Sequence, residues 1–438
     1  MRKRMRMMSI VLTLFVLFSA CTAEESPAPD TLTQEDGEQT PSGTNSQGEV
    51  QPNDGMTDED NDAGISEDVS YYLPGYDESV PSLCEAYEDA FKVGAAVNTD
   101  QLEEGSDFYQ LITKHYNTFV TENEMKPMYL NPSEGTFYFD AADKFVEFGE
   151  DVGATLRGHT LIWHSQAPEW WFVGEDGERA TREQLLARME EYITTVVSRY
   201  KGRIHTWDVV NEAMSDSNGG IRRDSESSQY ASIIGDLDGD GEDYDYIEQA
   251  FYWADAADPD AQLIINDYSL ESDMNKLDAF YEMVRAMLEK GVPIDGAGIQ
   301  AHIQMGYPSI PVFELAIEKL ASLKEVNPDF TVQITELDVS IFRWGDESTT
   351  REMTPELQTE FAEYYADLFE MFRRQAEKGN LDMVVTWGVY DGRSWLDSYP
   401  VAGRVNAPLL FDRRMMTKPA FWGVIDRSLI PDAVADMP

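Results

Sequence analysis

Short apolar runs alternate with longer amphipathic stretches along most of this chain, from Phe91 onward. In the longer stretches apolar residues recur every three or four positions, the period of a helix lying on a core. The clearest predicted helices are 185–200, 276–289 and 355–378. The short runs are rich in aliphatic residues and bounded by turn residues, as buried strands are. Strands are predicted at 93–97, 118–121, 155–158, 206–210, 263–265, 297–299, 332–335 and 383–386.

Eight strands alternating with helices over about 340 residues predict an α/β fold of the (β/α)₈ type, a TIM barrel. Periodicity alone also permits an open doubly wound sheet. No Gly-x-Gly-x-x-Gly turn follows a predicted strand, which disfavours that alternative. Since the chain stops shortly after the eighth unit, we expect a single catalytic domain within residues 71–438.

The first residues have the pattern of a secretory signal. Four basic residues among the first six precede an apolar run at 10–18, and Ser19-Ala20-Cys21 follows. The run is short for a membrane span. Small residues directly before a cysteine resemble a bacterial lipoprotein signal, so residues 1–21 are interpreted as that signal and Cys21 as the lipidation site. An ordinary secretory signal is the alternative. Either reading predicts an extracellular or cell-surface protein.

Residues 22–70 contain fourteen Asp or Glu and no Lys or Arg, among many Pro, Gly, Ser, Thr, Asn and Gln. Such a segment has too few apolar side chains to form a core, so we expect an acidic disordered linker. The whole chain has a formal net charge of −49. This surface would repel phosphates, so nucleic acid is not expected as a partner.

Polar side chains gather where the predicted strands end, which is the active-site face of a barrel. Two carboxylates, Glu212 and Glu336, directly follow the fourth and seventh strands. Their spacing around the barrel lets them face each other across its mouth, among tryptophans and neutral hydrogen-bonding groups. A protonated and an ionised carboxyl beside aromatic rings suit glycoside hydrolysis. Taken singly, an acid after a strand is more often a helix cap or an ion-pair partner.

The neighbours of each carboxylate suggest how the roles divide. Asp338 comes two residues after Glu336, and His302 ends the preceding strand. A histidine shared between two carboxylates would hold Glu336 ionised, which suits a nucleophile. Glu212 follows Asn211 and suits the acid/base. A metal-dependent hydrolase is disfavoured because His159 and His164 lack the His-Glu-x-x-His spacing.

The motifs ENEMK, GHTLIWHSQ, WDVVNEA, INDY, GIQAH, TELDV and WGVYDGRSW, in this order, resemble glycoside hydrolase family 10, the endo-β-1,4-xylanases. The resemblance covers residues 87–429. It implies Glu212 as acid/base, Glu336 as nucleophile, and His302 and Asp338 as the residues that orient the nucleophile. It also implies sugar-binding positions: Asn211 for the 2-hydroxyl, Tyr268 on the aglycone side, and Glu122, Asn123, Lys126, His159, Trp163, Gln166, Gln300, Trp387 and Trp395 on the glycone side.

The family resemblance implies endo-hydrolysis of internal β-1,4 bonds of xylan or xylo-oligosaccharides by a retaining double displacement, with the two carboxyl groups about 5–5.5 Å apart. The alternatives are a related β-1,4-glucan-active glycosidase and a non-catalytic surface lipoprotein that captures glycans. One departure is Pro127, where the family usually has Trp.

An acidic segment after the fourth strand, 236–242, looks like an insertion. Asp236, Asp238 and Asp240 alternate as in a calcium-binding loop, but the twelfth position is Ile247 where such loops have Glu. An acidic surface turn is the alternative. We expect no cofactor to be required, with a structural calcium ion as the one weak candidate.

Overall fold

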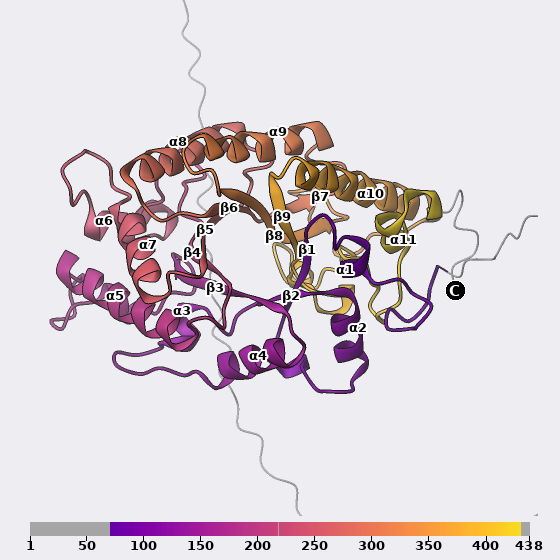
Figure 1. Ribbon diagram of the computed structural model, residues 1–438, viewed down its shortest axis with the longest axis horizontal. Helices are drawn as coiled ribbons and strands as arrows, with labels where there is room; N and C mark the ends of the chain where they lie inside the picture. The colour runs from indigo at the N-terminus through magenta and orange to yellow at the C-terminus, as the bar shows by residue number, and fades with distance from the viewer. Residues whose placement is uncertain (1–70, 218, 431–438) are drawn as a thin grey trace, which may run out of the picture. The chain divides into compact units, whose positions relative to one another are not determined.

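The computed structural model describes residues 71–217 and 219–430, which belong to one compact unit. A ring of parallel strands lies at the centre, and helices surround it (Figure 1). The predicted signal, its Cys21 and the acidic linker lie outside the described residues. Within the described residues, no helix has the length and apolar character needed to cross a membrane.

The strands close into the predicted barrel. Neighbouring strands pair in parallel in the order β6-β5-β4-β3-β2-β1-β9-β8, and a further pairing of β6 with β8 closes the ring. The short β7 pairs with the outer part of β8. The bounds are β1 Lys92–Val97, β2 Thr118–Thr121, β3 Thr155–Trp163, β4 Thr206–Asn211, β5 Gln262–Asp267, β6 Gly296–Ile299, β7 His302–Gln304, β8 Thr331–Ser340 and β9 Leu381–Thr386.

The helices between the strands begin and end with ordinary capping chemistry. In α5, Thr181 and Gln184 form a capping box, and α8 begins at an Asp273 cap and ends at Gly291 in the left-handed conformation. The helices are α1 Leu83–Ala86, α2 Asp107–His115, α3 Pro127–Leu130, α4 Asp140–Asp151, α5 Arg182–Arg199, α6 Tyr230–Ile234, α7 Asp245–Ala257, α8 Met274–Lys290, α9 Ile310–Ala321, α10 Pro355–Glu377 and α11 Pro419–Ile425.

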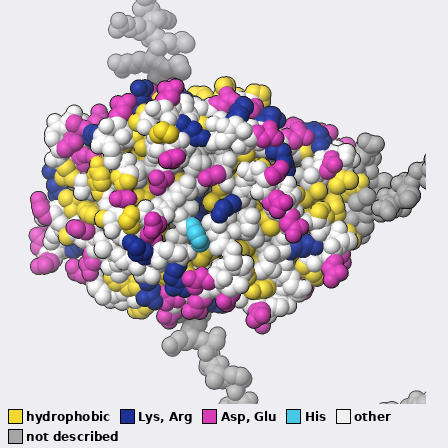
Figure 2. Space-filling model, viewed as in Figure 1, with side chains coloured by type: hydrophobic (Ala, Val, Ile, Leu, Met, Phe, Trp, Pro, Cys, Tyr) yellow, Lys and Arg dark blue, Asp and Glu magenta, His cyan; other side chains and the backbone are white. Residues whose placement is uncertain are grey.

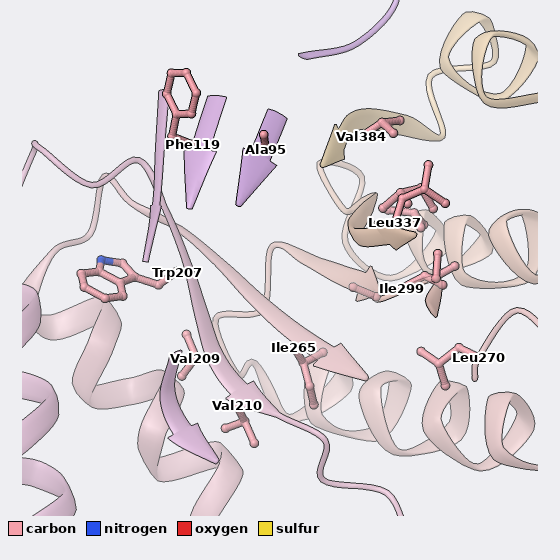
Figure 3. Packing of buried hydrophobic residues seen from close by; sticks show 14 of the residues in the cluster. Ala95, Phe119, Trp207, Val209, Val210, Ile265, Leu270, Ile299, Leu337 and Val384 are labelled. Carbon is pink, nitrogen blue, oxygen red and sulfur yellow. The ribbon is translucent and has the colours of Figure 1, made fainter. Parts of the chain in front are cut away.

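The core lies between the ring of strands and the surrounding helices (Figure 3). Its side chains come from successive strands, among them Ala95, Phe119, Trp207, Ile265, Ile299, Leu337 and Val384. Gly158 on β3 lets Trp207 of β4 approach, because a side chain there would meet the indole ring at 2.1 Å. Because the barrel strands are all parallel, their carboxyl ends lie together at one mouth of the barrel.

Carboxylates are spread over the face of the molecule in Figure 2, with Lys and Arg side chains between them. On the surface of the described residues, carboxylates form ion pairs between neighbouring outer helices or loops, such as Asp143 with Arg199 and Glu150 with Arg203. Exposed pairs of this kind add little stability. These ion pairs therefore contribute little to the fold and do not position the site.

Candidate active site

Glu212 and Glu336 reach the barrel mouth in different ways. Glu212 is the first residue after β4 and has a left-handed backbone, with a φ of 57°. Its N–H donates to the Asn266 carbonyl of β5 at 2.8 Å, which fixes the turn. Glu336 instead lies inside β8, where its side chain is only 4% exposed. The first carboxyl is half-buried and the second is buried.

Amide side chains link the two carboxyl groups. Gln300 Nε2 donates to Glu212 Oε1 at 3.0 Å and to Asn211 Oδ1 at 3.2 Å. Asn266 Nδ2 donates to that same Asn211 oxygen at 2.9 Å and to Glu336 Oε1 at 2.8 Å. The two carboxyls therefore converge on one part of the mouth, with Asn211 between them.

His302 lies between two carboxylates. Its Nε2 is 3.2 Å from Glu336 Oε2, and its Nδ1 is 2.9 Å from Asp338 Oδ2. Burial alone would lower the pKa of His302, but Asp338 and then Glu336 outweigh it and raise this pKa to about 10. Burial likewise opposes ionisation of Glu336, yet the His302 hydrogen bond and the nearby imidazoles hold the Glu336 pKa below its usual value. Glu336 is thus kept as a carboxylate beside an imidazolium.

A second histidine–carboxylate pair lies across the barrel. His159 Nδ1 is 3.0 Å from Asp208 Oδ2, and Arg157 Nε donates to the same oxygen at 2.9 Å. All three side chains are at most 2% exposed. Burial would raise the pKa of Asp208, but Arg157 and His159 together keep it lowered. Asp208 therefore stays charged and fixes the orientation of His159.

The end of β2 and the loop after β3 supply a polar wall. Lys126 Nζ donates to Gln166 Oε1 at 2.9 Å and to Asn123 Oδ1 at 3.1 Å, and it lies 4.9 Å from the centre of the Trp163 ring. Burial lowers the pKa of Lys126 to about 8, against the pull of Glu336 and Glu122. Burial also raises the pKa of Glu122. These groups present donors and acceptors suited to sugar hydroxyls.

Two tryptophans lie beside the histidines. The Trp387 ring is 5.3 Å from His159 and 6.3 Å from His302, edge to face in both cases. Trp395 contacts His302 at 4.8 Å, and its Nε1 donates to Asp338 Oδ2 at 2.7 Å. The indoles thus add flat apolar surface beside the two histidines.

Tyr268, after β5, belongs to a separate charged cluster. Its hydroxyl donates to Asp216, and Arg222 Nη2 donates to that hydroxyl at 2.8 Å. Lys276 lies over the ring at 3.5 Å. Burial and the Asp216 hydrogen bond raise the pKa of Tyr268 far above its usual value. The ring is therefore neutral and rigidly held on the Glu212 side.

A family model, glycosyl hydrolase family 10, matches residues 82–427. The chain belongs to that family. Endo-1,4-beta-xylanase C of Paenibacillus barcinonensis is 43% identical over 357 residues, which are 81% of this chain and 32% of that protein. Endo-1,4-beta-xylanase B of the same organism is 41% identical over 79% of this chain and 98% of its own length. A solved mutant structure in complex with xylotriose is 39% identical, with a TM-score of 0.72 over 79% of this chain and 99% of that one.

In this family 10 barrel, sequence reasoning missed three residues that organise the site: Arg157, Asp208 and Asn266. Arg157 and Asp208 lie within predicted strands, where a charged side chain flanked by apolar residues was the available signal. Asn266 directly follows a predicted strand and lies two residues before Tyr268. A polar residue at the carboxyl end of a barrel strand is itself a candidate site residue. Pro127, where the family usually has Trp, begins α3 at the first helical position, which its fixed φ favours.

In the acidic segment 236–242, two aspartates form ion pairs with a lysine of α8. Lys290 Nζ lies 2.5 Å from Asp240, 3.2 Å from Asp238 and 2.9 Å from Glu248. Oxygens of Asp236, Asp238 and Asp245 lie within 4.8 Å of one another. Lys290 therefore forms ion pairs with acids at this turn, while Asp236 and Asp245 have no ion pair with it among the described residues.

Proposed function

We infer that this family 10 protein is an endo-acting β-1,4-xylanase that hydrolyses internal bonds of xylan and xylo-oligosaccharides with net retention. The observation that carries the inference is the shared amide bridge between Glu212 and Glu336, with His302 on the far side of Glu336. It brings one buried carboxylate and one half-buried carboxyl to the same part of the barrel mouth, where tryptophan rings also lie.

In the first step the Glu336 carboxylate attacks the anomeric carbon while the Glu212 carboxyl gives its proton to the departing glycosidic oxygen. The C–O bond to the leaving sugar breaks, and an ester to Glu336 forms. In the second step Glu212, now ionised, takes a proton from water, whose oxygen attacks the same carbon and releases Glu336. We infer that Asn211, whose Oδ1 accepts a hydrogen bond from Asn266 Nδ2, binds the 2-hydroxyl during both steps.

The test is release of reducing sugar from purified xylan by the wild-type protein and by Glu336→Ala. We expect turnover only in the wild type, and NMR of the earliest product should show the β-anomer. Binding of xylan without turnover by the wild type would favour a glycan-capture protein. Faster cleavage of cellulose than of xylan would favour the β-1,4-glucan alternative, and the α-anomer first would exclude retention.

We also propose that the protein is exported and held at the cell surface by a lipid on Cys21. The support is the basic start, the short apolar run and the small residues before this cysteine. One lipid chain anchors weakly, so we expect more than one acyl group. Labelled palmitate should enter the wild type and the protein should partition into detergent, whereas Cys21→Ser should do neither. Labelling that survives this substitution would contradict the proposal.

A further inference from the structure

A row of contacts runs outward from the buried nucleophile to the surface. Glu336 is hydrogen-bonded to His302, His302 contacts the Trp395 ring at 4.8 Å, and Tyr399 stacks on Trp395. The Trp395 and Tyr399 ring centres are 5.5 Å apart, and the planes differ by 16°. Exposure rises along the row, from 4% for Glu336 to 55% for Tyr399.

The loop that carries Tyr399 holds its ring in place. The N–H groups of Ser398 and Tyr399 donate to the Trp395 carbonyl at 3.0 and 3.1 Å. Asp397 accepts from the Asn406 N–H at 2.9 Å and pairs with Arg413 at 2.6 Å. Because backbone and side-chain bonds both fix this turn, the stacked pair is ready before any ligand arrives.

One face of the Tyr399 ring is covered by Trp395, while more than half of the side chain remains exposed. Nothing among residues 71–217 and 219–430 is recorded as a hydrogen-bond partner of its hydroxyl. Flat aromatic faces bind the apolar faces of sugars, and a hydroxyl can both donate to and accept from sugar hydroxyls. The open side of this ring therefore offers both interactions that a pyranose uses.

We propose that Tyr399 forms an additional xylose-binding subsite, next to Trp395 and farther from the nucleophile. The occupant is a xylosyl unit of the same glycan chain, on the glycone side of the cleaved bond. This assignment rests on the proposed function, since it extends the cleft of a xylan-cleaving enzyme. The competing explanation is that Tyr399 only supports Trp395 from behind and never touches substrate.

Aryl β-xylosides with two, three or four xylose units separate these explanations, because release of nitrophenol fixes how many units lie on the glycone side. The measured quantity is the gain in kcat/KM for each added unit. Stacking of this kind contributes a factor of roughly 2 to 12. In Tyr399→Ala, we expect the gain in kcat/KM from one of the added xylose units to fall by that factor. In Tyr399→Phe, most of this gain should remain.

Tyr252→Ala is the matched control. It removes the same side chain from α7, in the outer ring of helices, where Tyr252 is 39% exposed. Its gain per added unit should match that of the wild type.

Two results would overturn the subsite. One is a gain per added unit in Tyr399→Ala that equals the wild-type gain, even where all three substrates lose activity by one common factor. The other is no gain with length in the wild type. Absence of xylan cleavage by the wild type would instead refute the proposed function itself.

Discussion

Replacing His302 by asparagine tests how the barrel keeps Glu336 ionised. The imidazole is the only side chain recorded within hydrogen-bond distance of Glu336 Oε2 among the described residues, at 3.2 Å. Its pKa of about 10 means that it is an imidazolium throughout the neutral range. The substitution removes that positive charge and leaves Asp338 nearby without its cationic partner.

Both consequences act in the same direction. A hydrogen bond between charged groups contributes about 1.5–3 kcal/mol, and one pKa unit corresponds to ~1.4 kcal/mol. Losing the imidazolium therefore raises the pKa of Glu336, and the unbalanced Asp338 charge adds to the rise. Since the nucleophile must be ionised, the acid limb of the pH profile should move upward by about 1–2 pH units.

The measurement is kcat/KM for an aryl β-xylobioside across the acid range, because this ratio reports the ionisation of the free enzyme. His205→Asn is the matched control. His205 is exposed, lies at the opposite end of β4 and accepts a hydrogen bond from the Leu156 N–H at 3.0 Å, which an asparagine oxygen can also accept. Its acid limb should coincide with that of the wild type.

An acid limb of His302→Asn that stays in place, or moves to lower pH, would refute this reasoning. A fall in kcat/KM by the same factor at every pH would show that His302 serves only geometry. Circular dichroism spectra that match the wild type would exclude loss of folding as the cause of a shift.

Two further predictions concern buried charge and metal. Asp208→Asn leaves Arg157 buried without the carboxylate that pairs with it, so the free energy of unfolding from urea denaturation should fall by about 3–5 kcal/mol; an unchanged value would contradict the structural role. Calcium should leave the melting temperature unchanged, because Lys290 already pairs with Asp238 and Asp240 of the acidic segment, and a chelator should leave xylan hydrolysis unchanged; a rise with millimolar calcium would support a metal site there.

The strands were predictable because each is a compact apolar run between turns. All eight predicted barrel strands are present, with bounds within two residues except at the ends of β3 and β8. Both strands continue farther than predicted, through His159–Trp163 and Glu336–Ser340. Polar side chains at these ends look like loop residues in a sequence, although in a barrel they point into the mouth. The short β7 was missed for the same reason.

The connections within the site depend on strand register, which hydrophobic patterning does not specify. Parallel pairing brings His159 opposite Asp208 and His302 opposite Asp338. These partners are 49 and 36 residues apart in the chain. The neighbours of Glu336 in the sequence, and then the resemblance to a family, suggested the second pair. For Asp208 the one signal was a charged residue between apolar ones, and it did not identify the partner. Only the folded ring shows that two histidine–carboxylate pairs flank Glu336.

Backbone strain collects at the same strand ends. Gln166, Glu212, Ser269 and Ala301 all have positive φ and follow β3, β4, β5 and β6. For residues other than glycine this costs about 1–3 kcal/mol each. The chain must leave a strand abruptly to place a side chain over the mouth, and the hydrogen bond from the Glu212 N–H to Asn266 helps hold one such turn. The large core thus stabilises a site geometry that the local sequence alone would not adopt.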